Sequence, residues 1–331
     1  MRPFRIISLV LVIPLLFISC KNDGGAKIIR LGHGLDMSHP VHKAMVFMAE
    51  RLAEKSDNTV KIQVYPSEQL GTERQCVELL QIGSLGMTKV SAGVLENFAP
   101  GMSVFGVPFL FDNIKHGYRV LDGEVGKELL SESEKYWLKG IAFYDAGSRS
   151  FYTKEKPVNE PDDLEGLKIR VMESATAMNM VRSLGGSPTP ISWGELYTAL
   201  QQGIVDGAEN NPPSFYLSHH YEVCKYYIID EHTMLPDVLI MSTMVWESLT
   251  EEEQGWLMEA AEESVEYQRK LWKEAEAHAL AEVKKAGVEI IYPDKTPFRK
   301  EVQDLTAQYM EDEVLNDYIK KIRNLSDERT N

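Results

Sequence analysis

The chain has 331 residues, of which 44% are hydrophobic and 26% charged, a composition typical of a globular protein with room for two domains. Its formal net charge of -15 argues against a nucleic-acid partner, because phosphate binding requires clustered Lys and Arg. An anionic small molecule is not excluded, but a few specifically placed cations must hold it.

The N-terminus has the pattern of an export signal. Two arginines precede an apolar run, residues 6–18, which is shorter than the roughly 20 residues needed to cross a bilayer. A serine and Cys20 end the run before a polar stretch, an order that resembles the lipobox of bacterial lipoproteins. We therefore expect a signal peptide at residues 1–19, lipid attachment at Cys20 and a tether at residues 20–26. The alternative is a plain cleavable signal in which Cys20 has no role.

Cys76 and Cys224 are the remaining cysteines. Their spacing fits neither a metal site nor a redox motif, and each falls in a helical pattern in a different half of the chain. An exported pair could form a disulfide, which would tie the two halves together. We expect two buried, unpaired thiols instead.

Strand and helix patterns alternate along the first half of the chain. Residues 28–33 and 60–65 alternate apolar and polar positions, as strands do, whereas residues 40–56 and 74–82 carry helical apolar stripes. The second half continues with a strand at residues 167–172 and then two helices at 174–184 and 193–203. This alternation indicates an α/β fold with helices on the faces of a sheet.

From Thr250 onward the pattern is that of one long helix. Thr250 and Glu253 fit a capping box, apolar residues recur at helical spacing, and Gly287 ends the pattern. About 36 residues would span about 54 Å at 1.5 Å per residue. That length exceeds the width of a small domain, so we expect the helix to cross both domains. The alternative is two helices broken near Tyr267.

Enzyme and metal motifs are absent from the sequence. It has no phosphate loop, dinucleotide fingerprint or nucleophile-elbow serine. His33, His39 and His42 are close together, as in some zinc sites, but Pro40 disturbs their spacing and no cysteine joins them. We expect neither a metal nor a cofactor.

Two arginines are candidate binding residues. Arg170 lies in the middle of a strand, on the face opposite its apolar neighbours, where a guanidinium can offer two donors to a carboxylate. An ion pair with Glu173 at a sheet end explains the pattern equally well. Arg149 lies in a segment that crosses between the two halves, where ligand clefts form, although a solvated loop arginine is the simpler interpretation. Residues 206–213 combine turn formers with two side-chain amides, which makes them a further candidate segment, and the simpler interpretation is a turn in which Asn caps its own backbone.

Several segments resemble the solute-binding proteins of tripartite ATP-independent periplasmic (TRAP) transporters. The most specific are GLKIRV, LGGSPTPISWGELYTALQQGIVDGAENNP and DEHTMLPDVLIMSTMVW, and the resemblance covers essentially the whole chain after the leader. It implies a two-domain periplasmic-binding-protein-like α/β fold with a central cleft, hinge strands and a long helix spanning both domains. Domain I would comprise residues 27–147 plus 236–275, and domain II residues 148–235 plus 276–331.

The resemblance also implies roles for individual residues. Arg170 matches the family's carboxylate-clamping arginine, Arg149 its supporting arginine, and Asn210, beside Glu209, the amide of the turn. The segments MTKVSAGVLENFAP and VDGAENNPPSFY are similar to the branch that takes hexuronates such as D-glucuronate or D-galacturonate. The residues that would then read the sugar hydroxyls are His33, His39, Glu73, Lys89 and His232.

The function implied is capture of a small sugar acid in the periplasm by a membrane-anchored lipoprotein, for delivery to TRAP membrane subunits. The two domains would close on the ligand about their hinge. One alternative is an exported sugar-acid enzyme using His33, Glu73 or Glu209 as acid and base. Another is a surface lipoprotein for adhesion or sensing.

Overall fold

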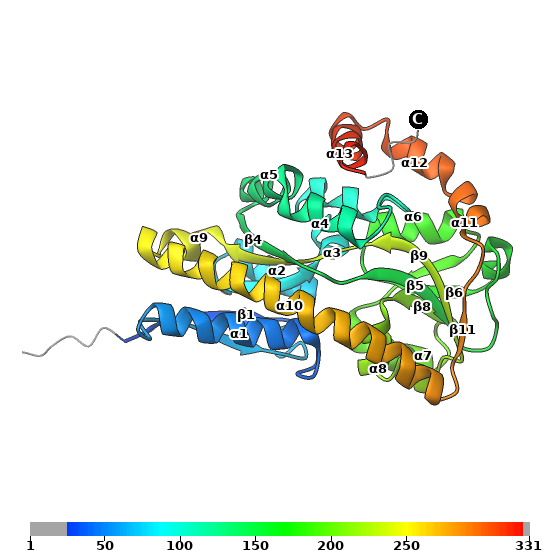
Figure 1. Cartoon of the computed structure of the whole chain (residues 1–331), viewed down its shortest axis with the longest axis horizontal. Coiled ribbons are helices and arrows are strands. Elements are labelled where there is room, and N and C mark those ends of the chain that lie inside the picture. The colour runs from blue at the N-terminus through cyan, green and yellow to red at the C-terminus, as the bar shows by residue number, and fades with distance from the viewer. Residues whose placement is uncertain (1–24, 327–331) are drawn as a thin grey trace, which may run out of the picture.

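A computed structural model describes residues 25–326 (Figure 1). The expected signal peptide, Cys20 and most of the tether lie outside these described residues. Within them, no helix combines the length and the apolar character that crossing a bilayer requires.

Two β-sheets form the centres of two lobes. The first sheet has the strand order β2-β1-β3-β10-β4, with β10 antiparallel to both of its neighbours. Its strands are β1 (Lys27–Gly32), β2 (Val60–Tyr65), β3 (Met87–Ser91), β4 (Leu138–Tyr144) and β10 (Asp237–Ser242). The second sheet has the order β11-β9-β5-β8-β6-β7. Its strands are β5 (Ser148–Thr153), β6 (Lys168–Val171), β7 (Ser187–Pro190), β8 (Gly207–Asn210), β9 (Tyr226–Met234) and β11 (Glu289–Ile291).

Helices cover both faces of each sheet, which confirms the predicted α/β class. The first lobe carries α1 (Pro40–Lys55), α2 (Glu73–Gln81), α3 (Ala92–Leu95), α4 (Ile114–Asp122), α5 (Glu124–Glu132) and α9 (Thr243–Glu247). The second carries α6 (Ala175–Ser183), α7 (Leu196–Gln201), α8 (Pro212–Leu217), α11 (Lys295–Glu301) and α12 (Gln303–Tyr309). Short 3₁₀ helices are η1 (Pro100–Gly106), η2 (Ser133–Tyr136), η3 (Pro161–Leu164), η4 (Trp193–Glu195) and η5 (His220–Glu222).

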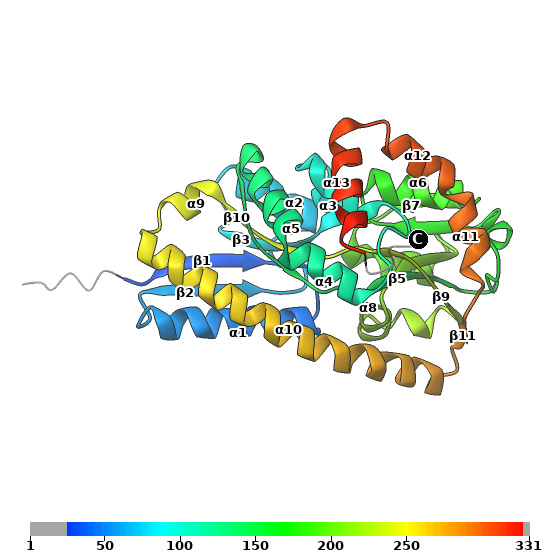
Figure 2. The ribbon, with the colours of Figure 1, turned by 45° about the horizontal axis from the view of Figure 1, so that its top comes forward.

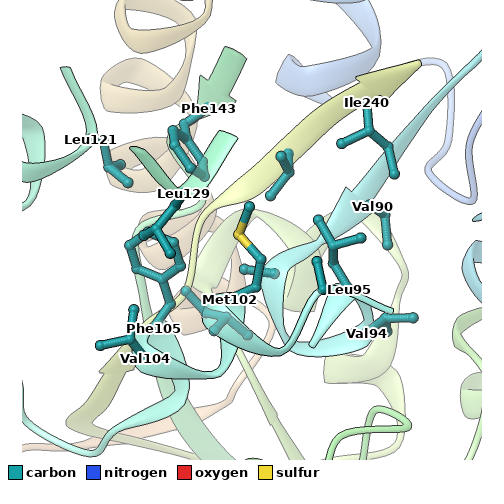
Figure 3. Packing of buried hydrophobic residues seen from close by; sticks show 14 of the residues in the cluster. Val90, Val94, Leu95, Met102, Val104, Phe105, Leu121, Leu129, Phe143 and Ile240 are labelled. Carbon is teal, nitrogen blue, oxygen red and sulfur yellow. The ribbon is translucent and has the colours of Figure 1, made fainter. Parts of the chain in front are cut away.

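Alternate residues of one strand enter separate cores on the two faces of the first sheet. Ile240 of β10 packs into the core under α2 to α5, whereas Leu239 and Met241 pack toward α1 and α10. Figure 3 shows the first of these cores. Its labelled side chains are Val90, Val94, Leu95, Met102, Val104, Phe105, Leu121, Leu129, Phe143 and Ile240.

The long helix α10 (Glu251–Lys285) is continuous over 35 residues, so the alternative with a break near Tyr267 is wrong. It begins with the predicted capping box of Thr250 and Glu253. It contacts α1 in the first lobe and α8 in the second, as Figures 1 and 2 show, so it spans both lobes as predicted.

The C-terminal helix α13 (Glu313–Asn324) packs on the first lobe. Tyr318, Ile319 and Ile322 are buried in the core that holds η1 and α5. The expected division assigns residues 276–331 to domain II, but α13 contacts the first lobe instead. The chain therefore returns to the first lobe after leaving the second sheet.

Two local assignments differ from the sequence predictions. Residues 193–203 form a 3₁₀ turn followed by the short helix α7, instead of one helix. Residues 207–210, predicted as a turn, form strand β8, because they pair with β5 and β6 from distant parts of the chain. Asn211 then caps α8 by accepting a 2.8 Å hydrogen bond from the Ser214 amide.

Cys76 and Cys224 are buried and unpaired, as predicted. Burial raises the pKa of the Cys76 thiol to about 11 and that of Cys224 to about 12. Both sulfurs therefore remain protonated and unreactive at neutral pH.

Candidate functional site

Two extended segments cross between the lobes and separate two hollows. Residues 145–147 join β4 to β5, and residues 235–236 join β9 to β10. On one side of them lies a cavity of about 60 Å³, enclosed between the lobes. That volume holds only a few water molecules, so a larger ligand can enter only when the lobes move apart.

On the other side of the crossing segments lies a much larger groove of about 910 Å³. Asp145, Gly147 and Ser148 line this groove, whereas Ala146 and Arg149 line the enclosed cavity. Gly147 has a φ of 60°, and a Cβ there would lie 3.0 Å from Trp272 Nε1 of α10, so the crossing requires glycine. The enclosed cavity is the candidate site because it contains buried charged groups from both lobes.

Arg170 reaches the enclosed cavity from β6 and is only 3% exposed. Its Nε donates a 2.9 Å hydrogen bond to the Ile191 carbonyl, and its guanidinium lies 5.8 Å from the centre of the Trp193 ring. Within residues 25–326, no carboxylate forms an ion pair with Arg170, so the pairing with Glu173 considered from the sequence is wrong. Burial lowers the pKa of Arg170, but a guanidinium stays protonated at neutral pH. Its terminal nitrogens remain available to an anion.

Arg149, from β5, is also buried but is fully paired, so the interpretation as a solvated loop arginine is wrong. It forms a two-pronged ion pair with Glu209, in which Nη2 lies 2.8 Å from Oε1. Nη2 also donates to the Glu209 carbonyl at 2.7 Å, and Nη1 to the Asn210 side chain at 2.9 Å. Burial opposes ionisation of Glu209, yet the charge of Arg149 lowers the pKa of Glu209 to about 2.

His232 lies behind this ion pair and does not line the cavity. Its Nδ1 is 2.7 Å from Asp230, and its Nε2 is 3.5 Å from Glu209 Oε2. Burial disfavours the charged imidazole, but the charge of Asp230 prevails and raises the pKa of His232 to about 9. His232 therefore supports Glu209 from outside the cavity.

Lys89 of β3 enters the cavity from the first lobe between two carboxylates. Its Nζ lies 2.6 Å from Glu73 Oε1 and 3.2 Å from Asp237 Oδ1. Despite burial, these carboxylates raise the pKa of Lys89 above its ordinary value. Burial raises the pKa of Asp237, with Lys89 opposing that effect. Asp237 was not identified from the sequence, because a single acid before an apolar strand also fits an ordinary strand end.

The three neighbouring histidines have different positions. His39 lines the cavity and caps α1, and its Nε2 shares a 3.3 Å hydrogen bond with Ser214 of the second lobe. His33 does not line the cavity, because its Nε2 is bonded to His42 Nδ1 at 3.0 Å. Burial lowers the pKa of His33 to about 2 and that of His39 to about 3, so both are neutral. Residues 25–326 contain no group of three His, Cys, Asp or Glu side chains that could hold a metal.

Two further contacts join the lobes around the cavity. Glu96 of the first lobe accepts hydrogen bonds from the Ser174 hydroxyl at 2.9 Å and from the Thr176 hydroxyl at 2.6 Å. Glu68 accepts a 3.1 Å bond from the Gly194 amide of the second lobe. With the bond between His39 and Ser214, these contacts hold the lobes in a closed arrangement.

Known proteins resemble this chain over most of its length. A family model described as bacterial extracellular solute-binding protein, family 7, matches residues 31–313. A solute-binding protein of Chromohalobacter salexigens is 35% identical over 83% of this chain and 82% of its own.

Two solved structures share the fold and carry a bound ligand. The first is a TRAP periplasmic solute-binding protein of Anaerococcus prevotii with bound D-glucuronate. It has a TM-score of 0.89 at 41% identity, and the match covers 92% of this chain and 99% of the other. The second is a TRAP periplasmic solute-binding protein of Xanthobacter autotrophicus with bound β-D-galacturonate. It has a TM-score of 0.87 at 40% identity, and the match covers 89% of this chain and 99% of the other. The predicted two-domain binding-protein fold is confirmed by these similarities.

Proposed function

Because the chain belongs to the family of bacterial extracellular solute-binding proteins, family 7, we propose that it binds a hexuronate such as D-glucuronate or D-galacturonate between its lobes. As a TRAP solute-binding protein, it works with the membrane subunits of its transporter. The family is one of transport proteins and not of enzymes.

One observation carries the choice of an acid as ligand. Arg170 is a buried guanidinium with no carboxylate partner in the described chain, and it faces an enclosed cavity. A buried charge without a counter-ion is unfavourable, and a ligand carboxylate supplies the missing partner through two parallel hydrogen bonds. In this proposal Arg170 clamps the carboxylate, while Arg149, with Glu209, positions Asn210 at the cavity wall.

Hydroxyl contacts must supply much of the affinity. A micromolar dissociation constant corresponds to about -8 kcal/mol, whereas one charge-assisted hydrogen-bonded pair contributes about 1.5–3 kcal/mol. The polar groups at the first-lobe wall, His39, Glu73 and Lys89, are placed to contact hydroxyls. We propose His33 and His232 as supporting residues, because neither lines the cavity.

The remaining parts of the proposal concern location and domains. The sequence pattern of residues 1–26 supports an exported protein anchored to the membrane through lipid on Cys20. Mass spectrometry of the membrane fraction tests the anchor, since Cys20→Ala should release the protein in soluble form. The division into domain I (27–147 plus 236–275) and domain II (148–235 plus 276–331) is retained as a proposal, with α13 docked on domain I.

A thermal-shift screen tests the ligand class. D-Glucuronate and D-galacturonate should raise the melting temperature, whereas D-glucose and D-galactose, which lack the carboxylate, should not. Ligand recovered from the incubation should be chemically unchanged, as a transport protein requires. A shift with the neutral sugars alone would refute the acid-binding proposal, and a chemically altered ligand would favour an enzyme.

A further inference from the structure

We propose that the cavity selects sugar acids with a single carboxylate over those with two, and that Asp237 is the residue that rejects the second carboxylate. This inference rests on the proposed function, since it concerns the far end of a ligand whose first carboxylate contacts Arg170. The proposed function assigns no role to Asp237, and the present inference does.

The charges around the cavity leave room for one anionic group. Arg149 and Glu209 compensate each other. Lys89 lies between Glu73 and Asp237, so this first-lobe cluster carries one net negative charge. Arg170 is the one cavity-lining cation of the described chain without a carboxylate partner. A single ligand carboxylate gives Arg170 its partner, whereas a second one finds no unpaired cation and lies beside a cluster of net negative charge.

The hydrogen-bond inventory of the first-lobe cluster leads to the same conclusion. Lys89 already donates to Glu73 and to Asp237 Oδ1, and Glu73 Oε2 accepts a 3.3 Å bond from the Ser91 amide. Within residues 25–326, Asp237 Oδ2 accepts no hydrogen bond, and Asp237 lines the cavity. The charged Lys89, 3.2 Å from Asp237 Oδ1, favours the ionised form of this carboxyl group. An ionised carboxylate only accepts hydrogen bonds, so Oδ2 requires a donor from the ligand. A hydroxyl can donate to it, and a second carboxylate cannot.

The two bound ligands in the similar structures fit this rule. D-Glucuronate and D-galacturonate each have one carboxylate, and hydroxyls at their other positions. D-Glucarate has a second carboxylate in place of the aldehyde carbon of D-glucuronate. With its first carboxylate on Arg170, D-glucarate would place this second carboxylate near Asp237 and Glu73. Repulsion between carboxylates that have no cation between them is an effective way to reject a competing ligand.

Isothermal titration calorimetry with D-glucuronate and D-glucarate tests the proposal. The wild-type protein should bind D-glucuronate at least about tenfold more tightly than D-glucarate. Asp237→Asn keeps the shape of the side chain but removes its charge, so it should reduce the preference several-fold. Glu73→Gln should act in the same direction and serves if Asp237→Asn fails to fold, because Glu73 is less buried.

A matched control removes a carboxylate outside the cavity. Glu78 lies on α2, as Glu73 does, but is exposed and paired with Arg74. Glu78→Gln should leave the ratio of the two affinities unchanged. Equal or tighter binding of D-glucarate by the wild type, or an unchanged ratio in both cavity variants, overturns the inference. Failure of D-glucuronate and D-galacturonate to bind would instead refute the proposed function.

Discussion

The two buried arginines of the second lobe differ in what surrounds them. Arg149 uses its whole guanidinium on groups of its own lobe, namely Glu209 and the Asn210 side chain. Arg170 uses only Nε on the protein, through the Ile191 carbonyl. Both side chains face the same cavity and have similar burial.

This difference shows how two strands of one sheet, β5 and β6, separate stability from recognition. An arginine with a complete set of partners fixes its neighbours, and its removal leaves a buried carboxylate unpaired. An arginine with free donors contributes less to the unliganded fold and more to binding. Burial alone does not distinguish the two roles, whereas the list of partners does.

The largest expected effect follows from removing Arg149. Arg149→Ala removes the two-pronged partner of the buried Glu209 and leaves only His232 Nε2 at 3.5 Å, so the free energy of unfolding should fall by about 3–5 kcal/mol. Urea denaturation measures the change. Arg74→Ala, which breaks an exposed pair with Glu78, is the control and should cost no more than about 0.5 kcal/mol. A loss at Arg149 no greater than that of the control would contradict the structural role.

Removing Arg170 should abolish ligand binding and change the stability of the unliganded protein very little, the reverse of the effect expected at Arg149. At a ligand concentration of 100 times the dissociation constant, the wild type gains about 2.7 kcal/mol of stability. Arg170→Ala should abolish this gain and leave the unliganded melt nearly unchanged. Arg170→Lys keeps the charge but not the two parallel donors, so it should recover only part of the gain. An undiminished shift in Arg170→Ala would remove this arginine from the site.

The pH dependence of stability should distinguish the surroundings of Arg149 from those of Arg170. His232, behind Glu209, has its pKa raised to about 9, so the folded state holds a proton that the unfolded state loses near pH 6.5. Its stabilising contribution is complete below pH 6.5 and is lost as the pH rises through 9. The slope contributed is at most about 1.4 kcal/mol per pH unit. Denaturation between pH 6.5 and 9 should show this slope in wild type and not in His232→Gln.

The smallest expected effect tests whether Arg170 gains its ligand only when the lobes meet. The Thr176 hydroxyl donates to Glu96 across the lobes, and Thr176→Val removes that bond while Ser174 still donates. Losing one such bond costs about 1 kcal/mol, so the affinity for D-glucuronate should fall about fivefold. Calorimetry measures it, with exposed Thr198→Val as the control. Equal affinities in the two variants would exclude a role for this contact in closure.

Local patterns in the sequence predicted the elements that depend on local chemistry. The capping box at Thr250 and the period of the following apolar residues were enough to predict α10. Arg170 was identified as a candidate from its strand position, but its pairing was not, because hydrogen-bond partners are set by tertiary contacts. His33 was expected to read a sugar hydroxyl, but in the structure its Nε2 is bonded to His42 and it does not line the cavity.

Features created by long-range pairing were not predictable from local pattern. Residues 207–210 read as a turn because Asp, Gly and Asn are turn formers, yet pairing with β5 and β6 makes them a strand. Asp237 gave no signal, since its importance comes from Lys89, which is 148 residues away. The docking of α13 on the first lobe likewise depends on a surface formed by distant residues.

The interleaved course of the chain has a consequence for dissecting this protein. β10 comes after the whole of β5 to β9, yet it lies between β3 and β4 in the first sheet. Cutting the backbone once at any loop between β1 and β11 therefore leaves at least one sheet with strands on both fragments. Limited proteolysis should give nicked molecules whose pieces co-purify under native conditions, and neither lobe should be obtainable by simple truncation.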